Sequence, residues 1–323
     1  MNRRNFLKGV PTMTALLGVF PATLSAVKRE KLPNKLERRS LGRTGEKLSI
    51  LGLGGIVVMN ATPQEASGRV SAAIDAGINY FDVAPSYGNA EEKLGPALEP
   101  YRKNVFLACK TTQRSKTGAA AELDNSLRKM RTDHFDLYQF HAVTKLEEVE
   151  QIFRPDGALE AFLEAKKAGK VRFMGFSAHS VEAALALMDR YPFDTILFPF
   201  NFATWHAGNF GPQVMAKAQQ KQMGILALKA MAKRPWPEGT PKTFSKCWYE
   251  PLSEQSEAML GLRFTLSHPI TAAIPPGDEN LFQMALQLAA KFTPLSASEV
   301  ETLKLKAMKT EPIFKYPQQG VNA

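Results

Sequence analysis

Four side chains suited to acid–base chemistry lie at or just after the ends of three successive apolar segments. They are Asp82 with Tyr87, then Lys110, then His141. When hydride adds to a carbonyl, the oxygen becomes strongly basic and must take a proton from a group whose pKa is near the working pH. Tyr87 can be this acid if the ammonium group of Lys110 lowers its pKa. Asp82 can keep Lys110 charged, and His141 can donate a hydrogen bond to the substrate oxygen.

Each of these residue types has an ordinary structural role when it occurs alone. A lysine at a strand end is usually solvated, an aspartate often caps a turn, and a lone tyrosine or histidine is usually part of the core. The occurrence of all four types on neighbouring strand ends favours the catalytic interpretation. We refer to Asp82, Tyr87, Lys110 and His141 as the tetrad.

The segments that must position the tetrad alternate between short apolar runs and amphipathic helical patterns. Eight runs have the character of buried strands: residues 49–54, 78–83, 104–109, 135–140, 171–176, 195–199, 224–228 and 271–274. Eight strands, each followed by a helix, in about 250 residues predict an α/β fold, a single (β/α)8 TIM barrel. An open doubly wound sheet is the alternative. In a barrel of this kind, catalytic groups lie at the carboxyl ends of the strands.

Two of the predicted helices have recognisable ends. Thr62 is placed to cap the first, with Pro63 at its first position, Glu65 three residues after the cap and a glycine beyond the end. The helix over residues 159–167 is expected to stop at Gly169 and to bury a stripe of residues. That stripe comprises Leu159, Phe162, Leu163 and Lys166.

Three segments fall outside the alternation. Residues 36–45 contain the turn sequence LGRTG and predict an N-terminal hairpin cap. Residues 231–253 are rich in Pro and Gly and too long for an ordinary connection, and such loops are usually functional. Residues 296–308 predict an extra C-terminal helix. The barrel is therefore predicted over residues 36–309 and a tail over 310–323.

Several motifs resemble those of the aldo-keto reductase superfamily. They are residues 77–91 (GINYFDVAPSYGNAE), 132–141 (TDHFDLYQFH) and 159–171 (LEAFLEAKKAGKV). The segments 39–55 and 262–276 are similar too, so the resemblance extends over about residues 36–292. It implies a barrel closed at the bottom by the hairpin, with Tyr87 as proton donor and the other tetrad residues as its partners.

The resemblance also implies that a nicotinamide nucleotide, NADP or NAD, binds across the rim of the barrel. In this chain the corresponding cofactor-binding residues are Gly54, Gly55, Asp82, Ser177, His179, Asn201, Leu228, Lys229, Ile274, Pro275, Pro276 and Gly277.

The cofactor positions depart from the family pattern at several points. Ser177 matches the family's serine, but Ala178 replaces the asparagine that follows it there. The usual glutamine of the sixth strand falls on Leu197. The usual aromatic residue and Ser-Pro of the seventh strand fall on Leu228, Lys229 and Ala230. These differences leave the identity of the nucleotide open.

The residues after the eighth strand bear on the choice between NADP and NAD. Asp278, Glu279 and Asn280 stand where family members that prefer NADP usually offer Lys, Ser or Arg. Two carboxylates would repel the 2′-phosphate of NADP. Lys229 could compensate for them, or could bind the pyrophosphate. We therefore expect a weak preference for NADP or a preference for NAD.

The first 26 residues differ from the rest of the chain. The run NRRNFLK at residues 2–8 is followed by a mildly apolar stretch to residue 26, and it resembles a twin-arginine (Tat) export signal. Glycines and prolines interrupt the stretch, which makes it a poor membrane span. The predicted organisation is a signal over residues 1–26 and a linker over 27–35, with export through the Tat machinery to the periplasm. A basic, unstructured terminus of a cytoplasmic protein is the alternative.

The composition excludes several other classes of protein. The chain has 323 residues, 44% of them hydrophobic, which is ordinary for a globular protein. Its 2 cysteines cannot form a disulfide framework, and no Cys or His pair has zinc-ligand spacing, so no metal site is expected. The net charge is +10. The basic residues are scattered singly, however, and do not indicate a nucleic-acid partner.

The sequence therefore predicts an exported oxidoreductase that transfers hydride between a nicotinamide nucleotide and an aldehyde, a ketone or the matching alcohol. A nucleotide-binding redox or ligand sensor with little turnover is the main alternative, because the cofactor positions are altered. A barrel isomerase or lyase using the same lysine is a third. The pattern does not reveal the substrate, the direction of turnover or the oligomeric state.

Overall fold

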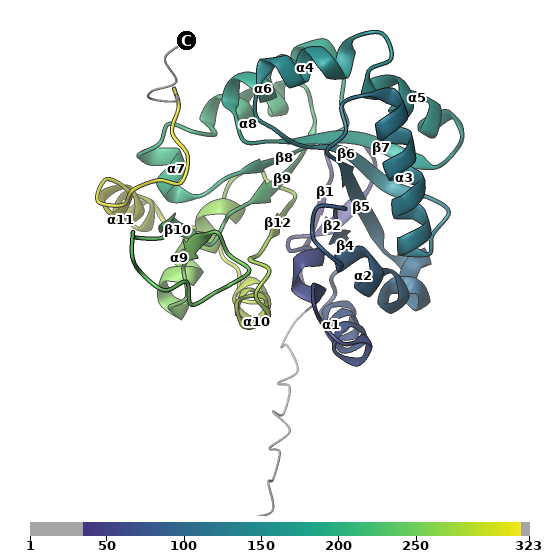
Figure 1. Ribbon diagram of the computed structural model, residues 1–323. Coiled ribbons are helices and arrows are strands. Elements are labelled where there is room, and N and C mark those ends of the chain that lie inside the picture. The colour runs from purple at the N-terminus through teal and green to yellow at the C-terminus, as the bar shows by residue number, and fades with distance from the viewer. Residues whose placement is uncertain (1–34, 318–323) are drawn as a thin grey trace, which may run out of the picture. The chain divides into compact units, whose positions relative to one another are not determined.

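The computed structural model describes residues 35–317, and an eight-stranded parallel sheet lies at its centre (Figure 1). In the sheet each strand neighbours the one that precedes it in the chain, with β9 next to the last strand. In chain order the strands are β3 (Leu53–Gly54), β4 (Tyr80–Asp82), β5 (Phe106–Thr111), β6 (Phe135–Val143), β7 (Val171–Ala178), β8 (Thr195–Pro199), β9 (Gly224–Leu228) and β12 (Ala272–Ile274).

The first and last strands meet and close the sheet into a barrel. Leu51, just before β3, forms a parallel bridge with Ala273 of β12. The backbone N–H of Ala273 donates to the carbonyl oxygen of Ile50 at 2.9 Å, and that of Gly52 donates to the carbonyl oxygen of Ala273 at 3.0 Å. The predicted TIM barrel is confirmed, and the open sheet is excluded.

Helices follow the strands and surround the barrel (Figure 1). They are α1 (Pro63–Asp75), α2 (Ala90–Leu98), α3 (Lys116–Met130), α4 (Leu146–Phe153), α5 (Ala158–Lys167), α6 (Val181–Arg190), α7 (Phe202–His206), α8 (Pro212–Gln220), α9 (Gln255–Leu266), α10 (Glu279–Ala289) and α11 (Ala297–Ala307). Two 3-10 helices, η1 (Gly55–Val58) and η2 (Glu99–Asn104), complete the set in the described residues.

The ends of α1 and α5 are confirmed, but the buried face of α5 differs from the prediction. Thr62 caps α1 through a reciprocal capping box with Glu65. In α5 the face toward the barrel consists mainly of small residues, Ala158, Ala161 and Ala165, together with Phe162. Leu163 is 42% exposed. The sequence pattern was misleading here because close packing of a helix against strands selects small side chains as well as large ones.

The predicted hairpin cap consists of β1 (Arg38–Ser40) and β2 (Lys47–Ser49), which pair antiparallel. Its turn closes the amino-terminal end of the barrel. Gly42 adopts φ +51°, and a Cβ atom on it would lie 2.3 Å from the backbone nitrogen of Gly224 at the start of β9. Only glycine therefore permits both this turn and this close approach.

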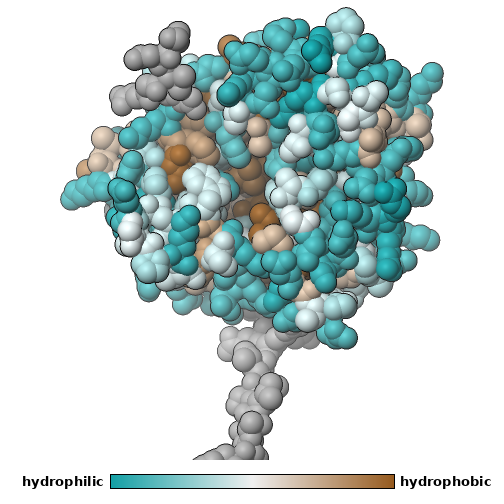
Figure 2. Space-filling model, in the orientation of Figure 1, coloured by the Kyte–Doolittle hydropathy of each residue, from teal (hydrophilic) through white to brown (hydrophobic). Residues whose placement is uncertain are grey.

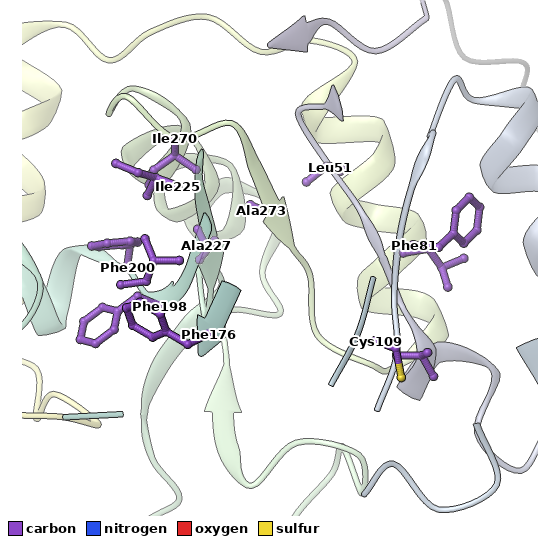
Figure 3. Close-up of a cluster of buried hydrophobic side chains, with 14 of the residues drawn as sticks. Leu51, Phe81, Cys109, Phe176, Phe198, Phe200, Ile225, Ala227, Ile270 and Ala273 are labelled. Atoms are coloured by element: carbon purple, nitrogen blue, oxygen red, sulfur yellow. The ribbon is translucent and has the colours of Figure 1, made fainter. Parts of the chain in front are cut away.

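The apolar core has two layers. Inside the barrel, Leu41 and Leu48 of the hairpin pack with strand residues such as Tyr80, Leu137 and Leu197. A larger layer lies between the strands and the helices, and Figure 3 shows part of it, including Leu51, Phe81, Phe176, Phe198 and Ala273. The outer surface in view is mostly hydrophilic, except for apolar side chains in a hollow near the middle of that face (Figure 2).

Residues 231–253, predicted as a long loop, contain a second antiparallel pair. Its strands are β10 (Ala232–Pro235) and β11 (Tyr249–Pro251). The extra helix α11 follows α10, and residues up to 317 continue from it. The twin-arginine segment 1–26, residues 27–34 of the predicted linker and the last six residues of the predicted tail lie outside the described residues. Among residues 35–317, no helix combines the length and the apolar character that a membrane crossing requires.

Candidate active site

A buried ion pair lies at the carboxyl ends of β4 and β5. Asp82 is 1% exposed and Lys110 is fully buried. The Lys110 Nζ atom donates to Asp82 Oδ1 and, at 3.2 Å, to the carbonyl oxygen of Val83. Burial lowers the pKa of Lys110, but the adjacent Asp82 carboxylate outweighs burial and raises it above the ordinary value. Lys110 is therefore a permanent cation.

Two further residues hold the other oxygen of Asp82. The Tyr80 hydroxyl donates to Asp82 Oδ2 at 3.1 Å, and Gln139 Nε2 donates to the same atom at 3.2 Å. Both side chains are buried. A carboxylate that accepts hydrogen bonds at both oxygens has a fixed orientation, so Asp82 fixes the position of Lys110 in turn.

Tyr87 lies in the turn that follows β4, where its backbone N–H donates to the carbonyl oxygen of Ala84 at 3.0 Å. The Lys110 Nζ atom lies 5.0 Å from the centre of the Tyr87 ring. Burial raises the pKa of Tyr87, and the charge of Lys110 lowers it without offsetting burial. Lys110 therefore has the expected effect on the pKa of Tyr87, but desolvation of the phenol is larger and the pKa stays above its ordinary value.

A bulge in β6 sets the direction of the His141 side chain. The pairing register of β6 with β7 shifts between Phe140 and Val143, and Ala142 adopts φ +51°. The Arg114 guanidinium donates to the His141 carbonyl oxygen at 2.6 Å, and the backbone N–H of Ala142 donates to Ser177 Oγ at 2.8 Å. Bulges commonly redirect a side chain beside an active site, and this one is held on both sides.

The His141 ring lies across from Tyr87. The two ring centres are 5.6 Å apart and the rings meet edge to face. Ser86 Oγ lies 3.2 Å from His141 Nδ1. Burial, followed by the charge of Lys110, lowers the pKa of His141 to about 2. The ring is therefore neutral, and when the Ser86 hydroxyl donates to Nδ1, Nε2 carries the proton and can donate it to a substrate oxygen.

The structure thus brings the four tetrad residues together. The rings of Tyr87 and His141 meet edge to face and Lys110 lies 5.0 Å from the centre of the phenol ring, so a substrate oxygen bound beside them can accept from both side chains. Such a site can protonate a carbonyl oxygen as negative charge develops on it. In the reverse reaction, the oxidation of an alcohol, the same groups must accept the proton.

The candidate cofactor residues of β7 and β8 offer free polar atoms. Ser177 accepts one hydrogen bond and keeps its own O–H to donate. Asn201 caps α7 through its side-chain oxygen, which leaves its buried Nδ2 without a partner. His179 Nε2 is also buried without a partner, and the ring stacks on Phe314 at 5.3 Å. Unpaired buried donors are costly, so these atoms indicate a polar ligand.

Lys229 directly follows β9 in a left-handed conformation, with φ +66°. Its Nζ atom lies 5.3 Å from the centre of the Trp248 ring and 4.8 Å from that of Tyr249. The preceding Leu228 is partly buried and packs against the interior of the barrel. Leu228 can therefore offer an apolar surface, though no aromatic face, to a ring.

The turn after β12 packs against the first strand. A Cβ atom on Gly54 would lie 2.9 Å from Ile274 Cγ2, and one on Gly277 would lie 2.3 Å from Ile56 Cγ2. A Cβ atom on Gly55 would lie 2.7 Å from Val83 Cγ2. A side chain at any of these three glycines would prevent the close packing of the segments. Pro275 and Pro276, which lie between Ile274 and Gly277 in the chain, are buried.

Asp278 and Glu279 do not act as two free carboxylates, contrary to the expectation from the sequence. The Asp278 side chain caps α10 by accepting from the N–H groups of Asn280 and Leu281 at 3.0 and 3.2 Å. Glu279 forms an ion pair with Arg69 of α1. Their repulsion of a phosphate is therefore weaker than the sequence implies, and Arg69 is a cation at this turn that sequence reasoning missed.

The residues present therefore fit a nicotinamide nucleotide at the polar positions. The donors of Ser177, Asn201 and His179 suit a carboxamide, and Lys229 is a cation of the site without a carboxylate partner in the described residues, whereas Arg69 is paired with Glu279. A large open cavity of about 1120 Å³ lies elsewhere, at the amino-terminal ends of the strands. It contains no tetrad residue, and its arginines at positions 102, 131 and 172 are paired with carboxylates.

Sequence reasoning missed the side chains that orient the tetrad. Tyr80 and Gln139 each lie two residues before a tetrad residue on the same strand. Because side chains two apart in a strand share a face, strand alternation could have identified both. No local pattern indicates Arg114 or Ser86, which reach His141 from other segments.

Comparison with known proteins agrees with this geometry. Residues 50–235 match the model of the aldo/keto reductase family. Aldo-keto reductase YhdN of Bacillus subtilis is 32% identical over 185 residues, which cover 51% of this chain and 54% of YhdN. The uncharacterized oxidoreductase YqkF of the same organism is 24% identical over 304 residues, 83% of this chain and 96% of YqkF. The chain thus spans about half the length of YhdN and nearly all of YqkF.

Solved structures show the same fold. The holo form of aldo-keto reductase AKR11C1 from Bacillus halodurans superposes with a TM-score of 0.68 at 22% identity, covering 88% of this chain and 100% of that one. The family match extends from the first barrel strand to β10 and includes all four tetrad residues. The chain belongs to the aldo/keto reductase family.

Proposed function

We propose that this protein transfers hydride between a nicotinamide nucleotide and a carbonyl compound, an aldehyde or ketone, or runs the reverse reaction on the matching alcohol. The observation that carries the proposal is the arrangement of the tetrad. A buried Lys110–Asp82 pair lies beside Tyr87, and the neutral His141 ring meets the Tyr87 ring edge to face. An assembled acid–base site of this kind favours turnover over the role of a sensor that only binds nucleotide.

The residues have distinct roles in this reaction. Tyr87 donates its proton to the substrate oxygen during reduction and takes it back during oxidation. Lys110 stabilises the phenolate that forms, and Asp82 holds Lys110 in place. His141 donates a hydrogen bond to the same substrate oxygen and polarises the carbonyl. The bound nucleotide supplies or accepts the hydride.

The nucleotide is held by residues at the carboxyl ends of the later strands. Ser177, His179 and Asn201 would contact the carboxamide, Leu228 the nicotinamide ring, and the turn from Ile274 to Gly277 a phosphate group. Two described cations lie at this turn. Glu279 neutralises Arg69, and Lys246 is engaged in donating to the carbonyl oxygens of Ile56 and Val57 at 3.0 and 3.2 Å, while Asp278 is occupied as a cap. We therefore expect NAD to bind at least as well as NADP.

The test is turnover by purified protein with NADH or NADPH and a panel of aldehydes. Tyr87→Phe keeps the ring and removes the proton donor, so turnover should fall about 10²–10⁴-fold while nucleotide affinity changes little. A variant with Phe at position 87 that works at a near-normal rate would exclude the mechanism. Nucleotide binding by the native protein with no turnover of any aldehyde would favour the sensor instead.

We further propose that the protein is exported to the periplasm through the Tat machinery, with residues 1–26 as the signal. The support is the sequence NRRNFLK followed by the apolar stretch. The Tat route carries folded proteins, so a tightly held nucleotide could travel with the barrel.

The export signal can be tested without changing its charge. Because a receptor reads residue identity, Arg3→Lys with Arg4→Lys should leave the protein uncleaved in the cytoplasm. Cell fractionation of native and twin-lysine forms decides the question. Equal distribution of the two forms between compartments would contradict a Tat signal.

A further inference from the structure

We propose that Lys229 binds a carboxylate on the substrate, so that the preferred substrates are carbonyl compounds that also carry an acidic group. This inference rests on the proposed function and names the substrate class of the same site. It arises from the surroundings of the Lys229 side chain, which differ from those of every other cation near the tetrad.

Lys229 has no carboxylate partner among the described residues. The other cations close to the tetrad are neutralised: Lys110 pairs with Asp82, and Arg114 pairs with Glu148 at 2.9 Å. The ammonium group of Lys229 instead lies over the faces of Trp248 and Tyr249. Aromatic faces stabilise a cation only in part, and its N–H groups still lack acceptors.

The Lys229 side chain is partly buried. Burial lowers the pKa of Lys229 to about 8, so the charged form is less stable there than on the open surface. A desolvated cation without a counter-ion gains more from an incoming anion than a solvated surface lysine does. The left-handed backbone at Lys229 holds the side chain in this place.

Lys229 lies on the side of the tetrad where it can bind a carboxylate of the substrate. The charge of Lys229 contributes to lowering the pKa of both His141 and His179, which agrees with a place on the same side of the barrel as these two rings. The other titratable group that interacts with Lys229 is the Cys247 thiol, whose pKa burial raises to about 11, so no carboxylate of the described residues competes for the cation.

An apolar wall connects Lys229 to the tetrad side of the site. Trp248 packs against Phe314 with ring centres 5.8 Å apart, and Phe314 stacks on His179. A flat apolar body could therefore lie along these rings, with its carbonyl at Tyr87 and its carboxylate at Lys229. Trp248 lies just before β11 and Phe314 lies after α11, both distant in sequence from the catalytic strands.

A matched pair of substrates tests the inference. 4-Carboxybenzaldehyde and methyl 4-formylbenzoate differ in charge and share the reacting group. We expect native protein to show a higher kcat/KM for the acid, and Lys229→Met to reduce this preference by about tenfold or more. Lys229→Arg should retain most of it. The control is Lys233→Met, because Lys233 pairs with Glu250 and Glu257 and should leave the preference as in the native protein.

Other outcomes separate the alternatives. If Lys229→Met slows both substrates equally and weakens nucleotide binding, Lys229 binds the pyrophosphate and the inference is wrong. If native protein shows no preference for the acid, the inference is also wrong, while the proposed function stands as long as the ester is reduced. If neither aldehyde nor any other carbonyl compound is reduced, the proposed function itself fails. Should Lys229→Met not fold, Lys229→Gln and inhibition of native protein by benzoate give the same comparison.

Discussion

The ammonium group of Lys110 lies 5.0 Å from the centre of the Tyr87 ring, yet the pKa of Tyr87 is above its ordinary value. Burial of the phenol raises that pKa, and the neighbouring charge only reduces the increase. The acid of the reaction is thus fully protonated at neutral pH. The positive charge of Lys110 stabilises the phenolate and so lowers the free energy needed to remove this proton from Tyr87.

The raised pKa of Tyr87 determines how the rate of reduction should depend on pH in the alkaline range. Because reduction needs protonated Tyr87, kcat/KM for reduction should stay constant through neutrality and fall only when Tyr87 ionises. Lys110→Met removes the charge that lowers the pKa, so the fall should move to higher pH and the rate should drop about 10²-fold or more. Asp82→Asn should act in the same direction more weakly. Identical pH profiles for native protein and both variants would show that Lys110 does not tune Tyr87.

The neutral state of His141 leads to an expectation at acid pH. An ordinary histidine titrates near pH 6.5, but the pKa of His141 is lowered to about 2. The lowered value means that the neutral ring persists as the pH falls through 6.5, so kcat/KM should show no inflection there. An inflection between about pH 6 and 7 that disappears in His141→Asn would contradict this assignment.

The Arg69–Glu279 pair is expected to weaken selection for NADP. Glu279→Gln removes the carboxylate and frees the Arg69 guanidinium, so the affinity for NADP relative to NAD should rise by about fivefold, the equivalent of about 1 kcal/mol. Fluorescence titration with both nucleotides measures the ratio. Adding Arg69→Met should abolish the gain, and Glu301→Gln on α11 serves as a charge-matched control. An unchanged ratio would mean that Arg69 does not reach the nucleotide.

A buried carboxylate near the amino-terminal end of the barrel should be important for stability. Asp136 is 3% exposed and accepts from Arg102 and from the backbone N–H of Leu107, both at 2.9 Å, and from Arg172 at 2.5 Å. Asp136→Ala should lower the free energy of unfolding by about 1–3 kcal/mol, because the buried Leu107 N–H loses its acceptor and Arg102 loses its carboxylate. Denaturant titration measures this. Asp133→Ala, at a side chain 93% exposed, should change it by less than about 0.5 kcal/mol; similar losses for both would refute the assignment.

The architecture could be predicted because it depends on local patterns. The strands Thr195–Pro199 and Gly224–Leu228 have the predicted bounds, since a buried parallel strand is an uninterrupted apolar run. The cap of α1 was equally local, because Thr62 and Glu65 are three residues apart. The tetrad could be grouped because the carboxyl ends of parallel strands must meet at one rim.

The electrostatics could not be predicted, because the partners come from distant segments. Asp278 and Glu279 looked like two free charges, but one caps its own helix and the other pairs with Arg69, about two hundred residues earlier in the chain. For Tyr87 the sequence indicated the charge of Lys110, which lowers the pKa of the phenol, but not the burial that raises this pKa by more. The free side chain of Lys229 is likewise visible only once its surroundings are known.

The bridge between Leu51 and Ala273 also constrains how the chain folds. The first strand gains its second neighbour only after the last strand has been synthesised, so the barrel cannot close while the chain is still growing. Contacts between such distant segments slow folding, because a long loop must be ordered before they form. A truncation that removes β12 would leave β3 and β9 with exposed edges, which are templates for aggregation. The last strand is therefore a condition for solubility as well as for activity.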